Sequence, residues 1–400
     1  MVSVQRANPL DVTRGREYTA LPLGSWLLYP SVFFGGVYDD NVNQSSTERV
    51  STAGLRVVPS LLAERNDGIQ KTTLYGMMDG RIYPDSNSAN TDTLAARGGF
   101  IHTYEALKDL VFRFQGDYTR QTDLFSTFGI DHSVTSLNPT GIGLAPVASP
   151  QTYNQFSGLA SVQKTFDQAF VSLAGSVVDI TYDHLNANQT SPDGVVYTGT
   201  GKGGFWFSPF LYAYTEATFD NRQYAAGTFD SHGYRVLGGV GSDQIGLFRG
   251  ELYGGYQAEQ YDLAALGTVG SAVFGGKLYY YPTRYLTVQG SVDETLGVSL
   301  LASAPGSPFG TATRLTSALL QANYAIDPAW TASVRAGYIR TVYVDNPRID
   351  SAWTAGGTLT YSVWRNFGLT LDYQYTQLVS NIPLQGFTRN VVTLGGTYRY

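Results

Sequence analysis

The chain has 400 residues, a net charge of −6 and no cysteine, and only 14% of its residues are charged. In an ordinary soluble domain roughly a quarter of all residues are charged, so this composition disfavours a soluble fold. The missing cysteines exclude thiolate metal sites and thiol nucleophiles, the negative charge argues against nucleic acid as a partner, and no apolar run is long enough for a transmembrane helix.

Residues 1–25 predict a short arm without a fold of its own, and residues 26–400 predict a single domain. The opening, MVSVQRANPLDVTRGREY, lacks the charged start and apolar core of a signal peptide. The remainder of the chain predicts an outer-membrane protein, which must be secreted. We therefore expect the sequence to be a processed or truncated form with an added Met.

Segments of about 10 to 16 residues alternate in polarity at every second position along most of the chain. Along 211–220, the face that carries Leu211 is apolar and the face that carries Glu216 is polar, and 248–259 and 369–376 alternate in the same way. Soluble strands are usually about five or six residues long, whereas a tilted strand needs roughly 9 to 11 to cross a bilayer core. These lengths predict membrane-crossing strands.

Short turns alternate with longer polar stretches. Eight short turns are predicted near 66–68, 107–109, 166–168, 208–209, 243–244, 282–283, 327–328 and 364–366. Nine longer loops are predicted at 39–52, 84–92, 122–152, 184–194, 223–232, 262–268, 299–312, 344–348 and 381–387. This order predicts an all-β fold: a transmembrane, antiparallel up-and-down β-barrel of the outer-membrane type with about 18 strands. The short turns and both chain ends, the N-terminus and the C-terminus, are expected to be periplasmic.

The turns recur about every 40 residues, which is also a period found in β-propellers. A propeller blade has four short strands in each period, whereas each period here holds two long ones. The spacing therefore favours the barrel.

The loop at 122–152 is the longest and is rich in apolar residues for a solvated segment. As a hypothesis, it folds into the lumen and narrows it, as a third loop often does in porins. The residues of this predicted constriction loop are Phe125, Phe128, Ile130, Leu137, Ile142 and Leu144.

Charged residues of both signs occur on the polar faces and predict a hydrated lumen. The predicted lumen-lining residues are Arg56, Glu64, Lys71, Asp79, Arg113, Asp117, Glu216, Asp220, Arg249, Glu251, Glu259, Asp293, Arg335, Asp372 and Arg399. In the alternative, these charges pair across the lumen and plug it. At about eighteen strands a barrel is wide enough for an aqueous channel, which favours a pore.

Aromatic residues are predicted in two places. Inward tyrosines, which would form a sugar-stacking track or merely fill lumen space, are Tyr75, Tyr212, Tyr214, Tyr253, Tyr279 and Tyr281. A periplasmic aromatic girdle is predicted near the short turns from Trp26, Tyr29, Phe205, Trp206, Phe207, Tyr285, Trp330, Trp364 and Phe367.

The last strand ends in TLGGTYRY, from Thr393 to Tyr400. A polar residue, a glycine two positions later, and aromatics at the antepenultimate and final positions resemble the signal by which the insertion machinery recognises outer-membrane barrels. Thr393, Gly395, Tyr398 and Tyr400 occupy these four positions.

Two segments resemble the putative β-barrel porin 2 family of proteobacteria. LLYPSVFFGGVYDDNV, at 27–42, is similar to the first strand of that family, and GKGGFWFSPFLYAYTEATF, at 201–219, is similar to one of its hairpins. The resemblance implies an outer-membrane barrel, and members of the family include general pores and proteins that accompany polysaccharide export. It implies no catalytic residues.

We accordingly expect an integral outer-membrane protein of a Gram-negative bacterium that acts as a porin-like channel for small hydrophilic solutes or saccharides. The alternatives are an outer-membrane component of exopolysaccharide export and, with less support, a barrel lipase or protease. An enzyme is disfavoured because His102 falls on a predicted lipid face and no GxSxG motif is present. No cofactor or metal is expected. The expected partners are outer-membrane lipid, lipopolysaccharide, the barrel insertion machinery and, in the export alternative, a periplasmic export protein.

Overall fold

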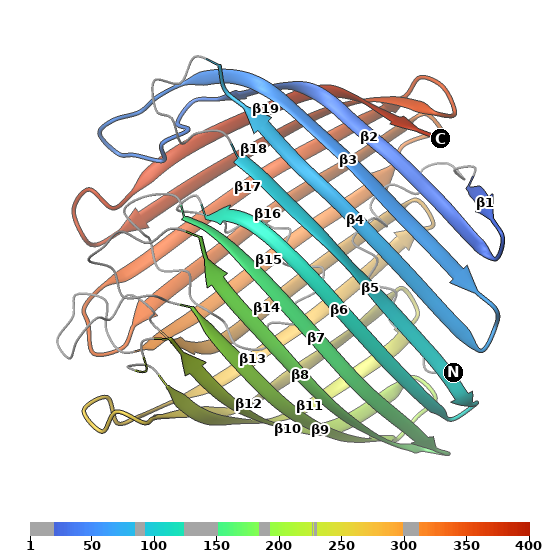
Figure 1. Cartoon of the computed structure of the whole chain (residues 1–400). Coiled ribbons are helices and arrows are strands. Elements are labelled where there is room, and N and C mark those ends of the chain that lie inside the picture. The colour runs from blue at the N-terminus through green and yellow to red at the C-terminus, as the bar shows by residue number, and fades with distance from the viewer. Residues whose placement is uncertain are drawn as a thin grey trace.

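The structure is a computed structural model and describes residues 20–84, 93–123, 151–183, 193–225, 227, 230–298 and 312–400. Eighteen of its strands, β2 to β19, form one closed antiparallel barrel (Figure 1). This confirms the predicted fold class and strand number. The described residues contain no helix that is long and apolar enough to span a membrane.

The strands are β1 Leu21–Leu23, β2 Trp26–Asp39, β3 Thr52–Asn66, β4 Gln70–Ile82, β5 Thr93–Leu107, β6 Leu110–Asp123, β7 Gln151–Phe166, β8 Ala169–Tyr182, β9 Gly194–Trp206, β10 Leu211–Tyr224, β11 Ser231–Ile245, β12 Phe248–Tyr261, β13 Thr268–Thr283, β14 Leu286–Val298, β15 Ala312–Ala325, β16 Trp330–Tyr343, β17 Ile349–Ser362, β18 Phe367–Ser380 and β19 Phe387–Arg399.

The short connections lie at one end of the barrel and the longer ones at the other, as predicted (Figure 1). Two predicted turns are misplaced by a few residues. Asp243 lies inside β11, and the chain turns at Gly246, which has a φ of 60°. Glycine adopts this left-handed backbone without steric cost, so it sets the turn rather than the preceding polar pair. Thr283 is likewise the last residue of β13, and the turn follows it.

β1 is not part of the barrel ring. It pairs antiparallel with the start of β2, with Leu23 opposite Trp26, across a turn in which Gly24 has a φ of 60°. It belongs to the predicted arm 1–25, of which residues 1–19 lie outside the described residues.

The barrel closes where β19 pairs with β2, from Val391 opposite Asp39 to Arg399 opposite Ser31. Backbone groups in hydrocarbon must be paired, and this seam leaves neither strand with a free edge. Arg389 reinforces the seam, because its Nε donates to the Asp39 carboxylate at 2.9 Å while Asp39 is fully buried. At the same level, the Asn390 amide donates to the Asp40 carboxylate at 2.6 Å.

Side chains along each strand alternate between an exposed apolar outer face and an inner face. Phe219 is 65% exposed and Leu252 is 66% exposed, whereas Tyr214, on the other face of β10, is 6% exposed. Exposed apolar residues occur around the whole barrel, which in water would amount to an aggregation-prone patch. A lipid-facing surface accounts for them.

Aromatic pairs mark two levels on this outer face. Near the short turns, Trp330 contacts Tyr361 with ring centroids 4.6 Å apart. Near the long loops, Tyr338 contacts Trp353 with ring centroids 4.3 Å apart. The two pairs lie eight residues apart along β16. At about 3.3 Å per residue and a tilt of about 40°, this separation spans about 20 Å along the barrel axis, close to the height of an outer-membrane apolar band.

Residues of two longer loops fold over the inner rim at the long-loop end. Val42 packs with Val37 and Tyr83, and Leu266 packs with Tyr224 and Tyr261. Both loop residues are buried. The inner wall is therefore more tightly packed at the long-loop end of the barrel than at the short-turn end.

The seam generates a prediction for stability. Replacing Arg389 by Gln should leave the buried Asp39 without its charged partner and lower the free energy of unfolding by about 3–5 kcal/mol. Urea unfolding in detergent, together with the folded mobility of unheated protein on gels, would measure the loss. Arg49→Gln is the matched control, because exposed Arg49 only donates a hydrogen bond to Thr388 at 2.7 Å. Equal losses in the two variants would contradict a special role for the seam pair.

Candidate functional site: the barrel lumen

The pairing register assigns each predicted charged residue to a face of the wall. Arg56 is opposite Gly35, Asp117 is opposite Gly99, Glu216 is opposite Lys202, and each of these positions lies on the inward face. The same register places all the predicted lumen-lining charges, from Arg56 to Arg399, on inward positions. Contact of these side chains with a passing solute stays a prediction.

One cluster lies on β3 and β4. The Arg56 guanidinium makes two hydrogen bonds to the Asp79 carboxylate, at 2.9 and 2.8 Å, and Arg81 approaches the same carboxylate at 3.3 Å. Arg56 also lies over the Phe33 ring, 5.8 Å from its centroid. Two cations share one anion here, so this part of the wall has a net positive charge.

A second cluster is centred on Asp117 of β6. Arg97 of β5 donates to its carboxylate at 3.0 Å, and Thr119 donates at 3.1 Å. The Tyr75 hydroxyl of β4 donates to the same group across the intervening strand. Two predicted residues, Tyr75 and Asp117, are thus brought into contact.

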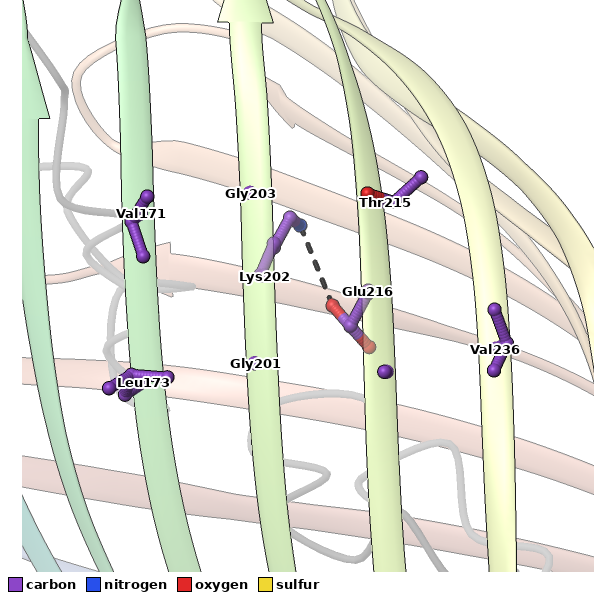
Figure 2. A pocket seen from close by; sticks show the side chains of 9 residues that line it. Val171, Leu173, Gly201, Lys202, Gly203, Thr215, Glu216 and Val236 are labelled. Atoms are coloured by element: carbon purple, nitrogen blue, oxygen red, sulfur yellow. Dashed lines mark ion pairs between the residues drawn. The ribbon is translucent and has the colours of Figure 1, made fainter.

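A third cluster joins β9, β10 and β11. The Glu216 carboxylate forms ion pairs with Lys202 at 3.7 Å and with Arg235 at 3.5 Å. Figure 2 shows Lys202 and Glu216 reaching toward each other from neighbouring strands. The Lys202 ammonium also lies 3.7 Å from the centroid of the Tyr214 ring.

A fourth cluster is buried toward the long loops. Arg222 pairs with Asp220 at 2.8 Å and with Glu259 of β12 at 2.6 Å, and all three side chains are at most 5% exposed. A fifth cluster lies on the opposite part of the barrel, where Arg335 pairs with Asp372 at 3.0 Å. Charged pairs in such positions need good geometry and further hydrogen bonds to offset desolvation. In the Arg222 cluster, one carboxylate oxygen of Glu259, Oε2, is buried without a hydrogen-bond partner among the residues that the structure describes.

In each of these clusters the partners are on the same strand, on adjacent strands or on strands separated by one other. The charges are therefore held along the wall, which differs from the predicted alternative in which they pair across the lumen. On β12 and β13, Arg249, Glu251 and Lys277 form no ion pair with any other residue that the structure describes, although Glu251 is directly opposite Lys277.

Several basic partners escaped the sequence prediction: Arg81, Arg97, Lys202, Arg222 and Arg235. The alternation itself could have identified some of them. Arg81 lies two residues from predicted Asp79, and Arg222 lies two residues from predicted Asp220, which puts each pair on one face.

Four of the six predicted inward tyrosines lie against glycines of the next strand. Tyr214 is opposite Gly239, and a Cβ built on Gly239 would lie 2.6 Å from the Tyr214 ring. Tyr212 covers Gly241 in the same way. Because glycine leaves room at the wall, each ring can lie along it instead of projecting into the lumen.

The same arrangement recurs elsewhere in the barrel. Tyr253 covers Gly275, and Tyr75 covers Gly99. The other two predicted tyrosines, Tyr279 and Tyr281, instead stack on each other with ring centroids 6.5 Å apart. The abundance of both residue types in the sequence, 45 glycines and 29 tyrosines, fits this complementarity.

Two aromatics assigned to the periplasmic girdle instead face the lumen. Trp206 contacts Tyr212 at 4.6 Å and lies 6.5 Å from Phe170, and Tyr29 is opposite the inward residue Leu62. The number of residues between an aromatic and the nearest turn does not decide whether its side chain faces lipid or lumen. The pairing register of the strands decides it. Trp206, Tyr212, Tyr214 and Phe170 form one aromatic cluster on the inner wall near the short turns.

The outer face of the same strands carries a hollow of ≈ 430 Å³. It is located at Gly201 and Gly203, whose missing side chains leave space between Leu173 on one side and Val236 on the other (Figure 2). A Cβ at Gly203 would meet no atom within 4 Å. Most of the residues that line the hollow, among them Leu173 and Val236, belong to the lipid-facing surface.

Two other sets of predicted residues have different outcomes. The predicted constriction loop lies outside the described residues, with all of its named positions: Phe125, Phe128, Ile130, Leu137, Ile142 and Leu144.

In the last strand, Thr393 and Gly395 face inward, while Tyr398 and Tyr400 are exposed on the outer face. A Cβ on Gly395 would come within 2.5 Å of the Phe33 ring, so the seam itself requires this glycine. Recognition by the insertion machinery stays a prediction.

Within the described ranges, no group of three or more His, Asp or Glu side chains is arranged to hold a metal ion. The candidate site is therefore the wall of the lumen, with its paired charges and flat tyrosine rings.

Comparison with solved structures finds barrels of distant sequence. The siderophore receptor PirA from Acinetobacter baumannii is 7% identical, with a TM-score of 0.47 and coverage of 93% of this chain and 80% of that one. The FrpB iron transporter from Neisseria meningitidis is 8% identical, with a TM-score of 0.46 and coverage of 95% and 82%. The yersiniabactin uptake receptor FyuA from Yersinia pestis is 11% identical, with a TM-score of 0.43 and coverage of 95% and 77%.

No curated protein sequence matches the chain. A family does match, over residues 18–400, and its description is putative β-barrel porin 2. The lipid-facing outer surface, the closed barrel and this match agree, and the chain belongs to that porin-like family of integral outer-membrane barrels.

Proposed function

We propose that the protein is a channel through which small hydrophilic solutes, saccharides among them, cross the outer membrane passively. The observation that carries the proposal is the arrangement of the inner wall. The paired charges of the five clusters lie along the wall, and Tyr75, Tyr212, Tyr214 and Tyr253 lie over glycines, so these side chains leave the central space to water. Barrels of about 16 to 18 strands are wide enough to enclose an aqueous channel.

The saccharide part of the proposal rests on the cluster of Trp206, Tyr212, Tyr214 and Phe170. Aromatic faces next to charged groups suit the apolar and hydroxyl-bearing faces of a sugar ring. Lys202 and Glu216, beside Tyr214, supply a donor and an acceptor at the same place. Export of a polysaccharide would use the same chemistry, and an associated periplasmic export protein would distinguish it from passive diffusion.

The proposed orientation places the long loops outside the cell and the short turns, with both chain ends, in the periplasm. It is supported by the asymmetry of the connections, because outer-membrane barrels have short periplasmic turns and longer extracellular loops.

Conductance of the purified protein in a planar bilayer tests the proposal. We expect discrete single-channel steps in salt solution and concentration-dependent block by oligosaccharides. Liposome swelling with sugars of increasing size would give the size limit. A correctly folded protein that produced neither conductance nor swelling would refute the proposed channel.

Ion selectivity should depend on Glu216. In Glu216→Gln, Lys202 and Arg235 lose their shared anion, and the permeability ratio should shift toward anions by up to roughly fivefold, since one charge at about 4 Å in water is worth about 1 kcal/mol. Reversal potentials in a salt gradient measure the ratio. Glu294→Gln, a change at an outer-face carboxylate, should leave it unchanged. A shift of equal size in both variants would contradict the placement of Glu216 in the ion path.

Conductance should also depend on the glycines behind the tyrosine rings. In Gly239→Val, the new side chain displaces the Tyr214 ring toward the lumen, which should reduce single-channel conductance and, through overpacking, cost about 1–3 kcal/mol of stability. Gly238→Val is the control at the adjacent position, because a Cβ there meets no atom within 4 Å on the outer face. Unchanged conductance in folded Gly239→Val would show that Tyr214 does not border the conducting path.

A further inference from the structure

A polar cluster interrupts the apolar outer face of β14 to β17 near the long loops. Four outward residues are directly opposite one another on successive strands: Glu294, Thr316, Arg340 and Ser351. Arg314 lies on the next rung of β15, diagonal to Arg340. We call these five residues the Arg314–Arg340 cluster.

The cluster lies at the edge of the apolar band. On β16, the outward residue before Arg340 is Tyr338, whose ring contacts Trp353 of β17 at 4.3 Å. Further along the same face toward the short turns comes Val334, which is 59% exposed. Tyr and Trp side chains concentrate at the boundary between hydrocarbon and headgroups, so Arg340 lies one rung beyond that boundary.

The cluster has one more cation than its carboxylate can neutralise. Glu294 accepts a hydrogen bond from Thr316 at 3.0 Å and pairs loosely with Arg314 at 3.9 Å. The Arg340 guanidinium is exposed and has no hydrogen bond or ion pair with any side chain in the part of the chain that the structure describes. Both guanidinium groups therefore have donors available to an external anion.

Another arginine at the same level provides a contrast. Arg120 follows the outer aromatic pair Tyr118–Phe156, as Arg340 follows Tyr338–Trp353. Its guanidinium, however, pairs with Asp183 and donates to Asn154 at 2.8 Å. Arg120 is thus neutralised by the protein itself, whereas the donors of Arg340 are left for an external partner.

We propose that the Arg314–Arg340 cluster binds a phosphate group of lipopolysaccharide in the outer leaflet. The proposal rests on the orientation given above, in which the long loops face outward. Side chains on directly opposite and diagonal positions are about 5 to 8 Å apart at Cβ, so both guanidinium groups can reach one phosphate. Guanidinium binds phosphate through paired hydrogen bonds, and the hydroxyls of Thr316 and Ser351 border the same place.

The test uses the full chain folded in detergent. Bis-phosphorylated lipid A is added to it, and native mass spectrometry counts the lipid A molecules bound to each protein. The double variant Arg314→Gln, Arg340→Gln should bind lipid A at least about tenfold more weakly, because it removes both guanidinium groups that would donate to the phosphate. Arg120→Gln, the matched control, should stay within about twofold of the unmodified chain. Folded mobility of unheated protein verifies that each variant has formed the barrel.

Three further probes identify the source of the phosphate. Dephosphorylated lipid A should bind the unmodified chain and the double variant equally weakly, and phosphatidylglycerol and inorganic phosphate should not displace bound lipid A at equal concentration. Equal lipid A affinity in the unmodified chain and the double variant would overturn the proposal. Displacement by phosphatidylglycerol or inorganic phosphate would overturn the assignment to lipopolysaccharide.

Discussion

The structure depends on one constraint: inside a membrane, each backbone N–H and C=O must find a partner within the protein. A sheet meets this constraint only when its first and last strands pair. Here the β2–β19 seam completes the ring, and Arg389, fully buried Asp39 and the glycines at 35 and 395 allow two strands remote in sequence to approach closely. The lumen, the apolar belt and the separation of turns from loops all follow from that closure.

Large and small side chains lie opposite each other on neighbouring strands of the inner face. Tyrosines cover glycines on the neighbouring strand, as Tyr214 does with Gly239. The rings contribute apolar contact to the wall, and their faces remain toward the lumen. The inside of a barrel can in this way be lined by large aromatic residues without being filled by them.

Charge is handled differently on the two faces. Inside, cations and anions such as Arg335 and Asp372 neutralise one another along the wall, where water can also solvate them. Outside, arginines such as Arg314 and Arg340 lie beyond the aromatic level of their strands, where an unpaired arginine costs only about 0–1 kcal/mol. Arg340 is such a residue, and its position beyond Tyr338 and Trp353 makes it accessible to headgroups of the membrane.

The sequence by itself determined the barrel class, the strand number and the face on which residues such as Glu216 and Leu252 lie, because polarity at every second position is a local property of a strand. It did not determine which residues meet across strands. The contacts of Tyr75 with Asp117 and of Arg335 with Asp372 depend on register, which accumulates over the whole ring. Trp206 was misplaced for that reason, and the turn at Gly246 because a backbone angle, not polarity, selects it. Only the tertiary structure decided which lumen charges pair along the wall, because such pairs join adjacent strands or strands separated by one other.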